Sequence, residues 1–426
     1  MIKNKFIKSS LILLIGSVFS KLMGAIIKIL QTRILGPSII FKYSSIMPTF
    51  MFLISLSSCG IPIATERLIA KGNYRSSNIL INSFIISFII NIVLSIIILI
   101  FGKFFIINIL KDKDLVLANY FIIPIIFFTS ISSIIRSYFF GKERMGIISI
   151  TSFLENLFRL IIVLLVYPLI KTFKYKYAIL SLIVIYAFTE GFSILFFLFF
   201  IPRRGFDKNI ISFNRHIFKL SFKTSFYTTL TGLINSLAFF IEMNIITYFN
   251  TFNMSLKPIY LSILNYTLPI ILLPSFISLT ISSSLIPRIN KLNSYKSIYK
   301  TIRLALTIIF IISFILLLTI YIYGSRISNI LFKYPNPLFI RTLVPFFIFQ
   351  YMIYPVNAYF DAKNKSYYNF YISLISFFIR TILLFILLKI YINIYVYIFI
   401  TIFNIIISFI IYFYLLHINL KQNKKA

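Results

Sequence analysis

The feature that most constrains this chain is a series of apolar runs, each about 20 residues long, recurring from end to end. A helix of that length crosses a bilayer core of about 30 Å. Hydrophobic residues make up 60% of the 426 residues and charged residues only 12%, whereas soluble domains carry about 25% charged residues. A water-soluble protein is therefore excluded, as is an outer-membrane barrel, whose strands would alternate apolar and polar residues. We predict an all-α protein with many membrane-spanning helices.

The apolar runs predict twelve spans. The expected spans are 9–32, 43–61, 77–101, 115–135, 147–170, 178–201, 220–248, 258–286, 304–323, 342–360, 367–388 and 391–416. The first run follows three lysines and is similar to a signal peptide, but it has no convincing small-residue cleavage site. We therefore expect an uncleaved first helix.

The basic residues predict the orientation of these spans. With the N-terminus inside, the cytoplasmic segments hold 25 of the 42 Lys and Arg residues, the outer loops hold 13, and four lie within spans. This bias follows the positive-inside rule and predicts a multi-pass protein with both termini in the cytoplasm. The net charge of +33 is interpreted as this topology signal plus the coding bias of an AT-rich genome, and not as nucleic-acid binding.

Two short motifs suggest an internal duplication. IPI at 61–63 is similar to IPR at 286–288, and YFFGK at 138–142 is similar to YFDAK at 359–363, at offsets of 225 and 221 residues. We predict a six-helix lobe over 1–201, a cytoplasmic linker over 202–219 and a second six-helix lobe over 220–426. Because six is even, the predicted pseudo-two-fold axis runs along the membrane normal, an arrangement that serves alternating access.

Stretches spread over nearly the whole chain also resemble a known family. They are SKLMG at 20–24, RILG at 33–36, GIPIA at 60–64, IIRSYFFG at 134–141, SSLIP at 283–287 and VPFFIF at 344–349, running on to Asn364 and Lys365. In this order they resemble the polysaccharide-exporter and stage V sporulation protein B-like group of the MOP flippase superfamily, which is related to lipid II flippases. The resemblance implies a MATE/MOP-like fold and a lipid-linked saccharide as substrate. The family often has Arg where this chain has Lys21 and Lys28, and fuller members often carry two further helices.

No Walker-type phosphate loop occurs, and the few acidic residues offer little material for a hydrolytic site. We expect neither enzyme activity, nor a cofactor, nor a metal site. The functional class that remains is a protein that moves a substrate across the membrane.

Ionisable residues within spans cost about 2.5–3.5 kcal/mol on insertion, so each is a candidate functional residue. Lys21 and Lys28 lie seven residues apart and share one face of the first helix, where their ammonium groups would suit a phosphate. The resemblance points the same way, because related flippases use cations of the first helix. Alternatively, Lys21 pairs with an acid and Lys28 extends to the outer interface.

The other in-span charges leave further alternatives open. Glu155 and Arg159 are spaced for an intrahelical pair, or they form a charged cavity wall whose pairing switches. Arg136 ends its span and either binds an anion or lies at the interface. Glu190 and Glu242 are candidates for ion coupling or for pairing with Lys21.

Arg380 has no local acid, so we expect a partner from another helix or a phosphate. Prolines at helix bends are candidate hinges, or kinks without function: Pro48, Pro62, Pro274 and Pro287.

These observations favour a monomeric flippase that moves a lipid-linked oligosaccharide or a peptidoglycan precursor across the bacterial cytoplasmic membrane. The head group, carried on a polyprenyl phosphate, would enter a cavity between the lobes while its tail stays among the membrane lipids. Three alternatives remain: an Na⁺- or H⁺-coupled multidrug exporter of the MATE type, a non-transporting scaffold for cell-envelope or sporulation assembly, and an ion channel, against which the two-lobe repeat argues.

Overall fold

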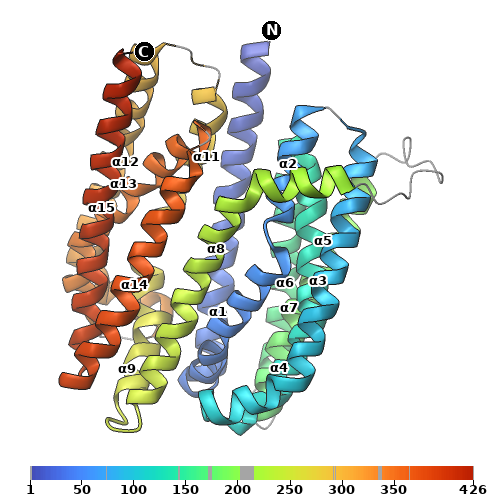
Figure 1. Cartoon of the computed structure of the whole chain (residues 1–426). Coiled ribbons are helices and arrows are strands. Elements are labelled where there is room, and N and C mark those ends of the chain that lie inside the picture. Colours follow the sequence, from blue (N-terminus) through green and yellow to red (C-terminus); the bar gives the residue numbers. More distant parts are fainter. Residues whose placement is uncertain are drawn as a thin grey trace. The chain divides into compact units, whose positions relative to one another are not determined.

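The computed structural model describes residues 2–425 except 73, 143, 171–174, 202–214, 291, 293, 334–337 and 364. Side chains are also left undescribed at 2–15, 17, 18, 21, 71, 167, 175, 176, 215–225, 283, 284, 287, 290 and 423–425. Every regular element in the described part is a helix (Figure 1). Ten helices there are long and apolar enough to cross a membrane, or eleven if one bent pair counts as a span.

The helices divide into two compact units, Met1–Ser236 and Leu237–Ala426. The dividing point lies within a helix, whereas the linker predicted at 202–219 lies mostly among the residues that the structure leaves undescribed. The predicted lobe boundaries therefore stay a prediction.

The first unit is built from seven α-helices and the start of an eighth. They are α1 (Ile2–Ser58), α2 (Ile61–Lys71), α3 (Ser76–Phe105), α4 (Val116–Tyr120), α5 (Ile122–Gly141), α6 (Met145–Ile170), α7 (Tyr175–Phe200) and α8 (Arg215–Phe249). A π-helical turn (Ile106–Leu110) and a 3₁₀ turn (Lys113–Leu115) join α3 to α4.

The first two predicted spans lie within the single element α1. Gly36 interrupts it with φ 78° and ψ 170°, a conformation open to glycine because it lacks a Cβ, and Pro37 follows. Figure 1 shows the chain reversing direction at this bend. The outer loop expected between the first two spans is therefore a sharp turn. Because both spans belong to one element, fewer than twelve separate spanning helices are found in the described part of the chain.

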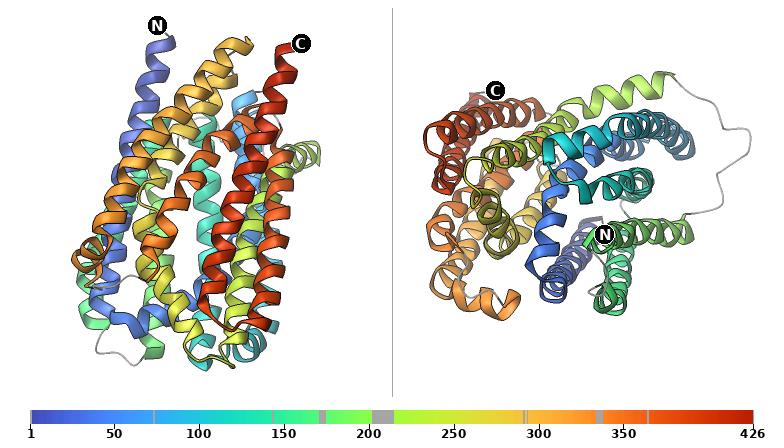
Figure 2. Two further views of the ribbon diagram at one scale, coloured as in Figure 1. Left: turned by 90° about the vertical axis from the view of Figure 1, so that its left-hand side faces the viewer. Right: turned by 90° about the horizontal axis from the view of Figure 1, so that it is seen from below.

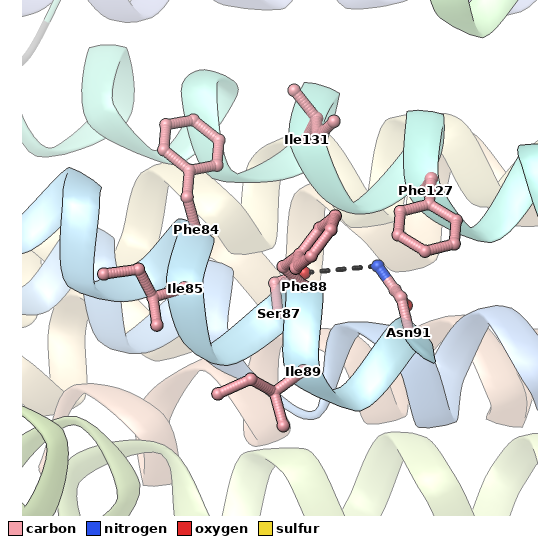
Figure 3. Close-up of a pocket in the computed structure, with 8 residues that line it drawn as sticks. All are labelled: Phe84, Ile85, Ser87, Phe88, Ile89, Asn91, Phe127 and Ile131. Carbon is pink, nitrogen blue, oxygen red and sulfur yellow. Dashed lines mark hydrogen bonds between the residues drawn. The ribbon is translucent and has the colours of Figure 1, made fainter. Parts of the chain in front are cut away.

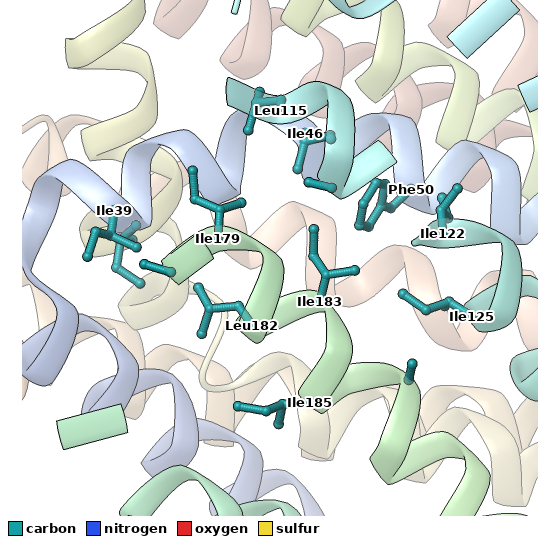
Figure 4. Packing of buried hydrophobic residues seen from close by; sticks show 14 of the residues in the cluster. Ile39, Ile46, Phe50, Leu115, Ile122, Ile125, Ile179, Leu182, Ile183 and Ile185 are labelled. Atoms are coloured by element: carbon teal, nitrogen blue, oxygen red, sulfur yellow. The ribbon is translucent and has the colours of Figure 1, made fainter. Parts of the chain in front are cut away.

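The core of the first unit consists of branched aliphatic residues from α1, α5 and α7. Ile46, Ile122, Ile125, Ile179 and Ile183 are almost fully buried in it (Figure 4). Because these residues are buried against one another, they fix how the three helices pack. The packing in turn positions the polar side chains that follow further along α5 and α7.

The second unit holds the rest of α8 and seven further α-helices. They are α9 (Leu256–Ser262), α10 (Leu268–Ile271), α11 (Ser275–Asn290), α12 (Tyr295–Phe332), α13 (Ile340–Ala362), α14 (Ser366–Ile390) and α15 (Ile394–Lys425). A π-helical turn (Ile263–Thr267) joins α9 to α10. Helices α13, α14 and α15 pack side by side, as Figure 2 shows. Several helices are longer than the predicted spans, because their polar ends stay helical outside the apolar stretch. Helix α12, for example, extends nine residues beyond its predicted span at each end.

Candidate functional site

The in-span charges of the first unit gather into one cluster, whose centre is Glu155 of α6. Its carboxylate accepts a hydrogen bond from Arg136 Nη2 of α5 at 3.0 Å and one from Arg159 Nη2, one turn further along α6, at 3.2 Å. The structure therefore contains the intrahelical pair that the four-residue spacing predicts, and adds Arg136 from another helix.

Helix α7 closes the cluster from another side. Arg159 Nη2 lies 3.8 Å from Glu190, and its Nε donates to the Thr189 hydroxyl at 3.2 Å. The second oxygen of Glu190 accepts a hydrogen bond from the Ser132 hydroxyl of α5 at 3.0 Å. Two guanidinium groups and two carboxylates thus balance in charge among three helices, which explains how such costly groups are tolerated within spans.

Local sequence spacing sets these positions. Ser132 and Arg136, Glu155 and Arg159, and Tyr186 and Glu190 are each separated by four residues, and side chains four apart share one face of a helix. The Tyr186 ring lies beneath the Arg159 guanidinium at 5.1 Å, a cation–π contact.

Arg136 is the more accessible of the two arginines. Its side chain is 35% exposed, against 21% for Arg159, while Glu155 is 9% exposed. Its guanidinium lies 5.6 Å from the Phe197 ring, and its buried Nε has no hydrogen-bond partner in the described part of the chain. A side chain that is 35% exposed offers its accessible guanidinium edge to an incoming oxyanion, whereas the buried Nε has no exposed surface.

Among its described residues, the second unit holds one ion pair of the same kind. Glu242 of α8 is fully buried and contacts Arg380 of α14, whose Nη2 donates to Glu242 Oε2 at 2.7 Å and whose Nε contacts Oε1. The buried rings of Tyr260 and Tyr397 meet edge to face, with centroids 4.9 Å apart, and Tyr397 lies beside the guanidinium. Arg380 therefore has a partner from another helix, which is one of the two alternatives that its isolation in the sequence leaves open.

Arg159 and Arg380 are equivalent positions of the proposed repeat. They are 221 residues apart, the same offset that separates the YFFGK and YFDAK motifs. Each arginine lies on the helix that follows its motif, and each contacts a carboxylate on another helix. The two halves thus share an arginine but differ in its partners.

Of the two candidate lysines of α1, the structure describes the side chain of only one. Lys28 is partly buried, and its backbone carbonyl accepts a hydrogen bond from the Thr32 hydroxyl at 2.8 Å. The side chain of Lys21 lies outside the described part, so its role stays a prediction.

The candidate hinge prolines lie at different kinds of position. Pro48 is inside α1, and Pro62 is in the first turn of α2, where no helical hydrogen bond is lost. Pro274 lies at the 60° bend between α10 and α11. Pro287 lies within α11, and its side chain is not described.

Sequence reasoning missed the neutral members of the cluster. Ser132, Thr189 and Tyr186 are ordinary residues in apolar helices, and only their spacing relative to the charges gives a signal. Which helix faces bring Arg136 to Glu155 depends on packing, which no local pattern encodes.

Comparison with solved structures identifies the fold. A multidrug resistance MATE family transporter of the MOP superfamily, in its inward-facing conformation, matches with a TM-score of 0.77 at 14% identity over 98% of this chain and 99% of that one. A MOP superfamily transporter from Pyrococcus furiosus, described as having a binding pocket of reverse polarity, matches with a TM-score of 0.71 at 15% identity over 99% and 96%. The fold is that of MATE/MOP transporters.

The family follows from the sequence comparison. Residues 6–293 match the model of the polysaccharide biosynthesis protein family, and the chain belongs to that family. Stage V sporulation protein B of Bacillus subtilis is 23% identical over 404 residues, covering 90% of this chain and 78% of that protein. Sporulation protein YkvU of the same organism is 28% identical over 162 residues, covering 37% and 35%. The chain is thus a helical membrane protein of the polysaccharide biosynthesis protein family, with the fold of MATE/MOP transporters.

Proposed function

We propose that this protein is a flippase that moves a lipid-linked oligosaccharide or a peptidoglycan precursor across the bacterial cytoplasmic membrane by alternating access. The family supports a glycan-related cargo, and the charge cluster supports an anionic head group. The single observation that carries the proposal is the accessibility of Arg136, whose side chain is 35% exposed although it is paired with the largely buried Glu155.

In this proposal Arg136 is the first cation that the head group meets. The predicted topology puts the end of α5 and the 136–146 segment at the cytoplasmic side, where lipid-linked precursors would enter. A phosphate oxygen would bond to the exposed edge of the guanidinium, in the fork geometry that guanidinium groups offer to oxyanions. Lys21 and Lys28 would add positive charge on α1.

Arg159 has a different role in the proposal. Its donors already contact Glu155, Glu190 and Thr189, so it holds the two carboxylates in place and keeps Arg136 oriented through Glu155. Arg380, paired with Glu242, would stabilise the second half and leave the substrate to the first.

The test is growth rescue of a bacterial strain whose lipid II flippases can be switched off. Rescue by the wild-type chain that is lost with Arg136→Gln and kept with Arg75→Gln is expected. Arg75 is an exposed arginine that precedes α3, so it controls for the loss of one positive charge in the same half. Equal rescue by both variants, at equal membrane levels, would remove Arg136 from the substrate path.

One observation favours the second candidate, a cation-coupled drug exporter. Glu155 and Glu190 converge on Arg159, and paired carboxylates are groups that take up protons or cations. In that case drug resistance conferred by the protein would be lost with Glu190→Gln and retained with Arg136→Gln, the reverse of the flippase expectation.

A further inference from the structure

The N-terminal end of α12 carries a stripe of basic residues, apart from the charge cluster and the ion pair described above. Lys296, Lys300 and Arg303 are exposed and are spaced four and three residues apart, so they share one face of the helix. The opposite face of the same turns includes Ile298 and Ile302, which are buried in the core of the second unit. Packing of α12 therefore turns this basic stripe outward.

Both acidic residues of the second unit have partners elsewhere. Glu242 contacts Arg380, and Asp361 accepts a hydrogen bond from Asn369. Helix α12 itself contains no acidic residue, although like charges three and four residues apart on a helix repel one another. None of the three cations of the basic stripe forms an ion pair in the described part of the chain. The stripe is thus open to an anion from outside the protein.

The same face of α12 continues as an apolar track. Leu304, Ile308, Ile311 and Ile315 follow the basic stripe at steps of three and four residues, and they are between 38% and 57% exposed. At about 1.5 Å per residue the track is about 17 Å long, close to half of a hydrocarbon core of about 30 Å. The Tyr299 ring is exposed beside the stripe, a position typical of tyrosines at a membrane–water interface. One helix face thus offers positive charge next to an apolar surface one leaflet deep.

A groove between α3 and α5 of the first unit lacks this combination. It has a volume of about 400 Å³, and Figure 3 shows Phe84, Phe88, Phe127 and Ile131 along it. Its exposed lining is almost wholly apolar, so it contains no group that would select one lipid head group over another. The groove is therefore an apolar surface without charge selection, against which the basic stripe can be compared.

We propose that the basic stripe of α12 binds the phosphate of an anionic two-chain phospholipid. The ammonium and guanidinium groups hold the phosphate through charge-assisted hydrogen bonds, and the acyl chains lie along the apolar track. An acidic protein or a nucleic acid would use the charges and leave the track uncovered. The predicted topology puts the stripe at the cytoplasmic leaflet, whose anionic lipids attract basic segments next to a span. This lipid is not the cargo of the proposed flippase, and the site does not rest on that function.

The protein contains no tryptophan, so an Ile308→Trp variant carries a single fluorescent reporter on the apolar track, about 7.5 Å beyond the stripe. The full-length protein is placed in vesicles of phosphatidylcholine and phosphatidylglycerol, with bromine on the acyl chains of one or the other. Quenching of the Trp fluorescence then reports which lipid lies against the reporter. We expect phosphatidylglycerol to bind there at least about fivefold more tightly, the effect of one Lys or Arg near an anionic head group. Introducing Lys296→Gln, Lys300→Gln and Arg303→Gln together should abolish this preference and leave quenching in brominated phosphatidylcholine alone unchanged.

Two controls separate the basic stripe from the overall charge of the protein. A second triple variant, with Arg326→Gln, Lys333→Gln and Arg341→Gln, removes three exposed cations at the other end of α12 and the start of α13, and should keep the preference. A Phe88→Trp reporter in the α3–α5 groove should show no preference. Equal affinities at Ile308→Trp would overturn the proposal and leave the stripe to an acidic protein or to solvent. A preference that survives the loss of the stripe, or that is as large in the groove, would also overturn it.

Discussion

The buried pair between Glu242 and Arg380 makes the sharpest stability prediction. Glu242 is fully buried and Arg380 is 27% exposed. When either one is replaced by Ala, the charge that remains is too buried for water to solvate it completely. Removing one partner of a buried ion pair costs about 3–5 kcal/mol, because the other charge is left without compensation. We expect each single substitution to destabilise the protein by this amount.

Replacing both groups at once removes the uncompensated charge. The double variant Glu242→Ala with Arg380→Ala should therefore be much more stable than the sum of the two single effects predicts. We expect a coupling energy above about 2 kcal/mol, whereas ordinary polar pairs between membrane helices average about 0.6 kcal/mol.

The assay is unfolding by SDS in mixed micelles, followed by circular dichroism, for the wild-type protein and the three variants. Additive effects, or a coupling energy near that of ordinary polar pairs, would refute the view that this pair holds α8 to α14. They would instead favour Arg380 as a free cation available to substrate.

Three further predictions follow from the backbone and the surface charges. A Cβ at Gly141 would lie 2.8 Å from the carbonyl oxygen of Glu66, so Gly141→Ala should destabilise by about 1–3 kcal/mol in SDS unfolding, whereas Gly24→Ala, which meets nothing within 4 Å, should not. Gly36→Ala should cost about 1–3 kcal/mol in the same assay because φ +78° with ψ 170° is a backbone region that essentially only glycine occupies, and an unchanged midpoint would contradict the assigned bend. Lys42→Met removes half-exposed ion pairs with two aspartates and should cost less than about 1 kcal/mol, with an effect on the thermal midpoint that shrinks as salt is added.

The sequence predicts the class of fold well because hydrophobicity alone separates membrane-spanning from soluble helices. Most expected spans coincide with helices, but the first two lie mainly in one bent element. The span expected at 115–135 is divided between α4 and α5, and the span expected at 258–286 is broken by a 60° bend between α10 and α11. Nothing in the local pattern at Gly36 separates a sharp helical break from a loop, because both use glycine and proline.

The candidate site is predicted only where partners lie on the same helix. The pair between Glu155 and Arg159 follows from helical spacing, whereas the contacts of Arg136 with Glu155 and of Glu242 with Arg380 join residues 19 and 138 positions apart. Those contacts depend on which helix faces meet.

The measurement that tests the central claim most directly is flipping of a fluorescent polyprenyl-pyrophosphate-linked saccharide in vesicles that contain the purified protein. Accessibility of the label to an external quencher reports which leaflet holds the lipid. The account predicts flipping by the wild-type protein and by Arg75→Gln, and a loss of at least about tenfold in rate with Arg136→Gln, as expected when a charge-assisted hydrogen bond is removed. Vesicles in which the wild-type protein moves no labelled lipid, or in which Arg136→Gln flips it as fast as Arg75→Gln, would contradict the account.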